Sequence, residues 1–93
     1  MVGSVTVTAA ADTVQITRAQ YTTSRSQLMV QATDSNPTST LTVSVTRSGV
    51  ILGTMINNGG GNYSAKFTGI TNPRNITVTS NFGGRDSAQV RVR

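Results

Sequence analysis

Three aspartates, Asp12, Asp34 and Asp86, are the only acidic residues of this 93-residue chain, which contains no histidine, cysteine or glutamate. Catalysis needs groups that move protons or attack a substrate, and no histidine is present to serve as a base beside a serine or threonine. A glycosidase of the paired-carboxylate type would need two of the aspartates to face each other. Asp12 precedes a predicted strand and the other two lie in predicted turns, where aspartate normally accepts a hydrogen bond from a backbone amide. We therefore expect a protein that is not an enzyme and has no catalytic residues.

The residue types also argue against metal and cofactor sites. A transition-metal site lacks its usual histidine and cysteine ligands. The loop Asp34-Ser35-Asn36 offers oxygens, but calcium usually takes about 6–8 of them from several carboxylates, and this loop has one. An intramolecular cross-link from Lys66 to an asparagine is conceivable, yet strand alternation points Lys66 toward solvent. We expect no metal and no cofactor, and interpret the loop as a capped turn.

The elements that carry these residues are predicted from alternating apolar and polar positions. The clearest runs lie between residues 63 and 92 and are separated by breaks rich in glycine and asparagine. Such runs are typical of antiparallel strands with one buried and one solvated face. The predicted strands are residues 13–18, 27–33, 40–46, 50–55, 63–67, 75–80 and 87–92. No window shows a helical period, so the pattern predicts an all-β fold, a seven-stranded antiparallel Greek-key β-sandwich.

The length predicts one sandwich domain, residues 11–93. Residues 1–10 are expected to be either a leading segment added to the natural sequence or the end of a preceding module or linker. The second alternative is slightly favoured because Ser4-Val5-Thr6-Val7-Thr8 resembles residues 87–92. No apolar run of about 18 residues exists, so we expect no membrane insertion.

Residues 60–67, 75–80 and 88–92 resemble, in their order, bacterial immunoglobulin-like and fibronectin type III-like surface modules and, more loosely, filamin repeats. The shared features are a Gly-x-Tyr start of a strand, a strand that ends in a glycine turn, and a Val-x-Val terminus. The chain lacks the cysteine pair and core tryptophan of the antibody type. The resemblance implies an immunoglobulin-like fold and a non-catalytic module of a secreted or cell-surface protein. Such a module would be extracellular and monomeric, and would act as a spacer or adhesion unit between neighbouring domains of a longer chain.

The four aromatic residues define the first candidate ligand contacts. Tyr63 and Phe67 share one face of a predicted strand and are expected in the core. Tyr21 and Phe82 lie in predicted loops, where exposed rings could stack on sugars. They support an alternative function, a carbohydrate-binding accessory module of a secreted hydrolase with polysaccharide as partner. Specific nucleic-acid binding is not expected, because base stacking has the same shortage of aromatic residues.

The eight cations give a formal net charge of +5. They are spread along the sequence, as is typical of cations that serve solubility. Arg91 and Arg93 are two residues apart on one predicted strand and therefore share a face. Together with Arg47 they are the candidate contacts for a third function, binding of an anionic polymer.

Overall fold

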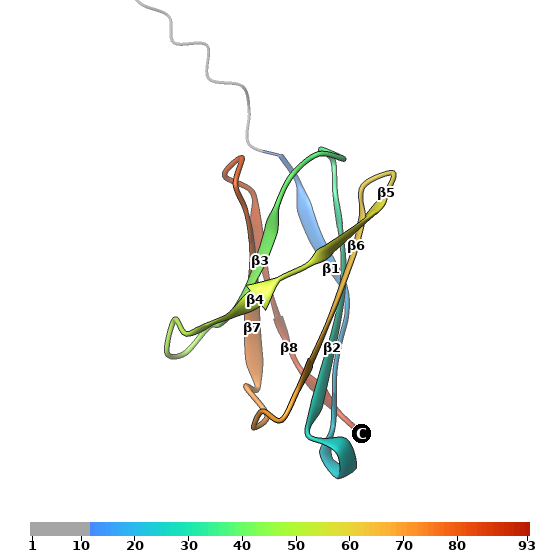
Figure 1. Ribbon diagram of the computed structural model, residues 1–93. Helices are drawn as coiled ribbons and strands as arrows, with labels where there is room; N and C mark the ends of the chain where they lie inside the picture. Colours follow the sequence, from blue (N-terminus) through green and yellow to red (C-terminus); the bar gives the residue numbers. More distant parts are fainter. Residues whose placement is uncertain (1–11) are drawn as a thin grey trace, which may run out of the picture.

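The computed structural model describes residues 12–93, which form two β-sheets packed face to face (Figure 1). The strands are β1 (Val14–Thr22), β2 (Gln27–Asp34), β3 (Leu41–Val45), β4 (Ile51–Thr54), β5 (Ile56–Gly59), β6 (Asn62–Thr68), β7 (Asn75–Ser80), β8 (Arg85–Gln89) and β9 (Arg91–Val92), with one short 3-10 helix, η1 (Thr23–Arg25). One sheet has the order β5-β6-β2-β1-β9 and the other the order β4-β3-β7-β8. The predicted all-β sandwich is confirmed, with nine strands in the described residues instead of seven. The predicted role of residues 1–10 lies outside the described part.

The two additional strands arise where the chain changes sheets, at the end of the predicted strand 50–55 and within the predicted strand 87–92. The first change occurs at Met55, between β4 of the smaller sheet and β5 of the larger one, and the second at Val90, between β8 and β9. Each of these residues is buried and donates its amide to a carbonyl, Met55 to Leu41 and Val90 to Arg74. Both crossings lie at sheet edges, because β4, β5, β8 and β9 are all edge strands, and Figure 1 shows the first as the chain passes from β4 to β5. Val92, predicted to face inward, is therefore exposed beyond the second crossing.

β1 is longer than predicted and contains a β-bulge. Residues 19–22, which lie beyond the predicted strand 13–18, continue the strand and pair with β2 as far as Thr22 opposite Gln27. The register shifts between Ile16 and Arg18, so Thr17 is an extra residue. A bulge of this kind reverses which faces the following residues occupy, and the strict period of two is lost. Residues 56–59, which lie between the predicted strands 50–55 and 63–67, also form a strand, because they pair with β6.

The core lies between the sheets and follows the alternation of the unbroken strands. Its fully buried side chains are Leu28, Val30, Leu41, Val43, Ile76 and Val78. Tyr63 and Ala65 of β6 are buried and Phe67 packs against the core, whereas Lys66 is exposed, as predicted. Gly53 of β4 lies against Phe67, and a Cβ at this position would come within 2.9 Å of the ring. Within residues 12–93 no helix is long and apolar enough to cross a membrane.

Candidate functional site

The three aspartates are held in the backbone hydrogen-bond framework. The Asp12 Oδ1 atom accepts the Gly84 amide at 2.8 Å, and the Asp86 Oδ2 atom accepts the Ile16 amide at 2.9 Å. Asp86 lies in β8, so its predicted placement in a turn is wrong, whereas Asp34 ends β2 and caps the turn that follows it. The prediction that Asp34 and Asp86 accept backbone amides is confirmed. The Asp86 carboxylate links the two sheets, because it lies in one sheet and binds the bulge of β1 in the other.

Asp12 and Asp34 come together at one end of the sandwich, although 22 residues separate them in the sequence. Burial is the largest single influence on the pKa of Asp12 and acts to raise it. Hydrogen bonds with the side chains of Asp34 and Ser80 and with the Gly84 amide together outweigh burial, so the pKa of Asp12 lies below its usual value of 3.8.

Asp34 also anchors a buried polar network. Its Oδ1 atom accepts the Asn36 amide at 3.1 Å, and its Oδ2 atom accepts the hydroxyl of Ser39. The Tyr63 hydroxyl lies 3.0 Å from the Ser39 hydroxyl and donates to the Ser39 carbonyl or the Asn36 carbonyl. The loop after β2 is thus a capped turn, as interpreted from the sequence. In the described residues, no group of three or more histidine, cysteine, aspartate or glutamate side chains could hold a metal ion.

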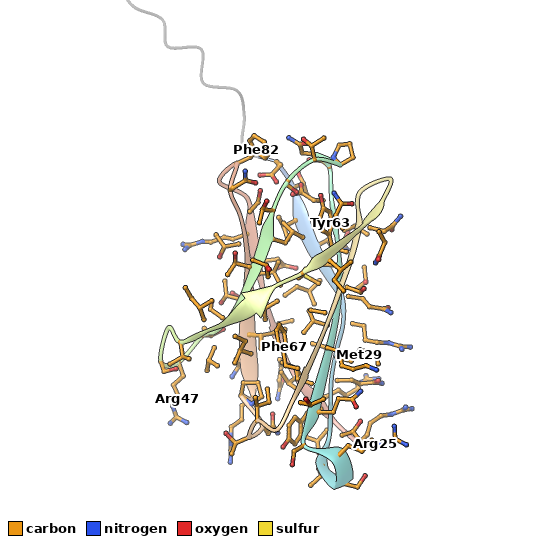
Figure 2. The ribbon with its side chains drawn as sticks, viewed as in Figure 1. Arg25, Met29, Arg47, Tyr63, Phe67 and Phe82 are labelled. Carbon is orange, nitrogen blue, oxygen red and sulfur yellow. The ribbon has the colours of Figure 1, made fainter. Side chains whose placement is uncertain are left out.

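The two candidate aromatic contacts do not form a site together. Tyr21 lies in β1, not in a loop, and only 6% of it is exposed. The bulge at Thr17 turns its ring toward the core, and its hydroxyl donates to the Ile70 carbonyl at 2.7 Å. Phe82 is exposed in the turn between β7 and β8, at the opposite end of the sandwich from η1 (Figure 2). A pair of rings stacked on sugar is therefore not available from Tyr21 and Phe82.

The three candidate arginines lie in two separate places. Arg47 is exposed in the turn between β3 and β4, and Figure 2 shows it on the opposite side of the molecule from Met29 of β2. Arg91 lies in β9, where it pairs with Gln20 of β1. Arg93 follows β9 and is fixed by its backbone, because its amide donates to the Tyr21 carbonyl at 2.8 Å. Arg91 and Arg93 therefore belong to the larger sheet, and Arg47 does not.

The register of the larger sheet gathers further cations around Arg91. Lys66 of β6 lies opposite Met29, Met29 lies opposite Gln20, and Gln20 lies opposite Arg91, so these four residues form one row across the sheet. The next row contains Arg18 of β1, Gln31 of β2 and Ser64 of β6. We call the outward surface made by these seven residues the basic face. With strands about 4.8 Å apart and about 6.8 Å between alternate residues, the Cα atoms of Arg18 and Arg91 are about 8 Å apart, and those of Arg18 and Lys66 about 12 Å.

A groove borders the basic face where β8 leaves the smaller sheet. Its volume is about 460 Å³, and its wall includes Arg18, Gln20, Gln89 and Arg91. Two guanidinium groups and two amides thus line one opening between β1 and the chain from β8 to β9. In Figure 2, nitrogen-tipped side chains extend from the side of the molecule on which Met29 is labelled.

The sequence interpretation missed Arg18, Lys66 and the glutamines as site residues. Five cations belong to the larger sheet or to its end beside η1, namely Arg18, Arg25, Lys66, Arg91 and Arg93. A usable signal exists, because Gln27, Met29 and Gln31 alternate with buried residues on one strand and Lys66 occupies the same kind of position on another. Only the pairing of strands shows that these positions adjoin.

The chain matches no protein-family model, and no curated protein or solved structure was found to match it. The interpretation of its function therefore depends on the geometry of its own residues.

Proposed function

We propose that this chain is a non-catalytic, immunoglobulin-like module of a secreted or cell-surface protein that acts as a spacer or adhesion unit. The observation that supports this most is the strand order. If β1, β2, β3, β4, β5, β6, β7 and β8 take the letters A, B, C, C′, D, E, F and G, the sheets read A-B-E-D and C′-C-F-G. Constant-type immunoglobulin domains have the sheets ABED and CFG, and the variable type adds C′ to the second.

The path of the chain supports a spacer role. β1 begins at one end of the sandwich, and the C-terminus lies at the other (Figure 1). Neighbouring domains attached there would be held apart by the length of β1, whose nine residues span about 30 Å. The first strand, β1, and the last strand, β9, are hydrogen-bonded to each other. They run parallel, and β9 pairs with Gln20 and Tyr21 of β1.

This pairing suggests a mechanical test by single-molecule force spectroscopy. A force applied through the two ends would shear β1 against β9, loading the bonds from the Arg93 amide to the Tyr21 carbonyl and from the Thr23 amide to the Arg93 carbonyl together. Arg93→Pro removes the first of these donors, and Arg93→Ala, the matched control, keeps it. We expect the proline variant alone to unfold at a lower force. A wild-type chain that extends without a distinct unfolding peak would contradict the spacer proposal.

A carbohydrate-binding accessory role is the second candidate. It does not depend on Tyr21, which is buried, but is favoured by the groove beside Arg18 and Arg91. Polar hydrogen-bonding groups at a concave surface are the usual means of fixing the orientation of a small polar ligand.

A further inference from the structure

We infer that the basic face and its groove bind an acidic polysaccharide, with Arg18, Lys66 and Arg91 contacting its carboxylate or sulfate groups. This inference specifies the partner for the adhesion role in the proposed function and rests on that role. It assigns binding to a sheet surface and to residues different from the loop aromatics and Arg47.

Charge is the first argument. The basic face contains three cations. Arg25 of η1 and Arg93, whose carbonyl accepts the Thr23 amide of η1, lie toward the same end of the larger sheet. The chain has only three acidic residues: Asp12 and Asp34 contact each other at the far end of β1, and Asp86 is bound to the Ile16 amide. Like charges concentrated on one side of a small domain produce a field that attracts polyanions. The opposite outer surface contains one strand cation, Arg85 of β8. Beside it, Thr77 hydrogen-bonds to Thr46 at 2.8 Å and to Ser87 at 2.9 Å.

The polar residues between the cations favour a sugar polymer. Gln20 and Gln31 lie between Arg18 and Arg91 or beside them. Gln27 is the outward residue of β2 that adjoins Met29, just outside the basic face. A glutamine amide both donates and accepts hydrogen bonds, so it suits hydroxyl groups, whereas arginine and lysine only donate. Nucleic acid fits less well. Single strands are bound largely by stacking on aromatic rings, and Tyr21 and Tyr63 are both buried.

The groove supplies a place for an individual acidic group. A guanidinium group can make two parallel hydrogen bonds to a carboxylate, and sulfate oxygens are acceptors of the same kind. Arg18 and Arg91 lie on the wall of one 460 Å³ groove, with Gln20 and Gln89 beside them. A sugar ring seated there would present its acidic group to the arginines and its hydroxyls to the amides. Lys66, at the far side of the row, would then contact a later unit of the same polymer.

The test compares two triple variants with the same net charge. Arg18→Gln, Lys66→Gln and Arg91→Gln together alter the basic face. Arg47→Gln, Arg74→Gln and Arg85→Gln remove three exposed cations elsewhere and are the matched control. Each lowers the formal net charge from +5 to +2. Binding to heparin, polygalacturonate, neutral dextran and duplex DNA is measured by affinity electrophoresis and titration calorimetry at several salt concentrations.

We expect the wild-type chain to bind heparin or polygalacturonate, to ignore dextran, and to lose affinity steeply as salt increases. The basic-face variant should bind about tenfold more weakly, which is about 1.4 kcal/mol of binding free energy, or roughly 0.5 kcal/mol for each of the three exposed charge contacts. The control variant should stay within about twofold of the wild type. Circular dichroism and the urea midpoint establish that both variants fold, and Arg91→Gln alone serves as a milder variant.

Three results would overturn the inference: no binding to either acidic polysaccharide, equal losses in both triple variants, or duplex DNA bound by the wild type as tightly as the polysaccharide. These outcomes are distinguishable from failure of the spacer proposal. A chain that binds no polymer but resists force remains a spacer. A chain that binds heparin through the basic face but shows no unfolding peak retains only the adhesion role.

Discussion

Val78→Asp is expected to unfold the domain, whereas Thr79→Asp on the same strand should be nearly neutral. Val78 is 0% exposed, and its neighbour across the sheet, Val43, is also fully buried. Its partner on the other side is Asp86, so the new carboxylate would also adjoin an existing negative charge. Thr79 is exposed and lies opposite Arg85, which would face a new aspartate favourably.

The expected loss of stability in Val78→Asp has two parts: the cost of protonating the new aspartate and the loss of the buried valine side chain. A buried aspartate must be kept neutral, and pH 7 lies roughly three pH units above its usual pKa. At about 1.4 kcal/mol for each unit, protonation costs about 4 kcal/mol. Loss of the buried valine adds about 2 kcal/mol. The total of about 6 kcal/mol compares with a global stability of about 4–12 kcal/mol for a domain of roughly 80 residues. The substitution therefore removes at least half of the expected stability at pH 7, and all of it at the lower end of that range.

Urea denaturation followed by circular dichroism measures this difference. The Val78→Asp variant should lose its folded baseline at pH 7 or have its free energy of unfolding reduced by at least half, whereas that of Thr79→Asp should stay within about 0.5 kcal/mol of the wild type. Val78→Ala is the milder variant and should fold with a reduced midpoint. Equal destabilisation by the two aspartates, or a stable Val78→Asp domain, would refute the assignment of the faces of β7 and with it the position of the core.

Two further predictions concern polar groups. Tyr21→Phe deletes the hydroxyl bonded to the Ile70 carbonyl and should lower the free energy of unfolding by about 1 kcal/mol in urea denaturation, with no loss of polysaccharide binding; a binding defect in the folded variant would contradict its core placement. Because the folded pKa of Asp12 lies below its usual value of 3.8, its ionised form contributes stability above that pH, and this contribution is lost as the pH falls through the folded pKa. The urea midpoint should thus fall less between pH 7 and pH 3 in Asp12→Asn than in wild type, and an equal decline would show that Asp12 has no part in the acid sensitivity.

The strands that could be predicted from the sequence are those in which one face stays buried from end to end. In β6 and β7 the residues Tyr63, Ala65, Ile76 and Val78 alternate with solvated ones, and each is buried as predicted. The period of two is sufficient there because both strands lie within one sheet along their whole length. Only long-range pairing reveals where the chain changes sheets. Val90 is as apolar as any inward residue of a continuous strand, so the crossing beside it leaves no local signal.

The basic face could not be predicted because it depends on two irregularities. If β1 continued in register from Val14 and Ile16, Arg18 would point inward and Tyr21 would point to solvent. The bulge at Thr17 reverses both, so the same extra residue removes an aromatic from the surface and adds a cation to it.

The second irregularity is the crossing at Val90. Without it, Arg91 would continue the outward series of β8 and lie on the smaller sheet, far from Lys66. Because the chain crosses there, Arg91 pairs beside Gln20 and completes the row. Bulges and strand changes disturb the hydrogen-bond ladder, and their recurrence near binding surfaces is generally explained by the side chains that they redirect. In this domain both departures from a regular sandwich direct an arginine to the same groove. This coincidence supports a binding role for the groove more strongly than the net charge of the chain does.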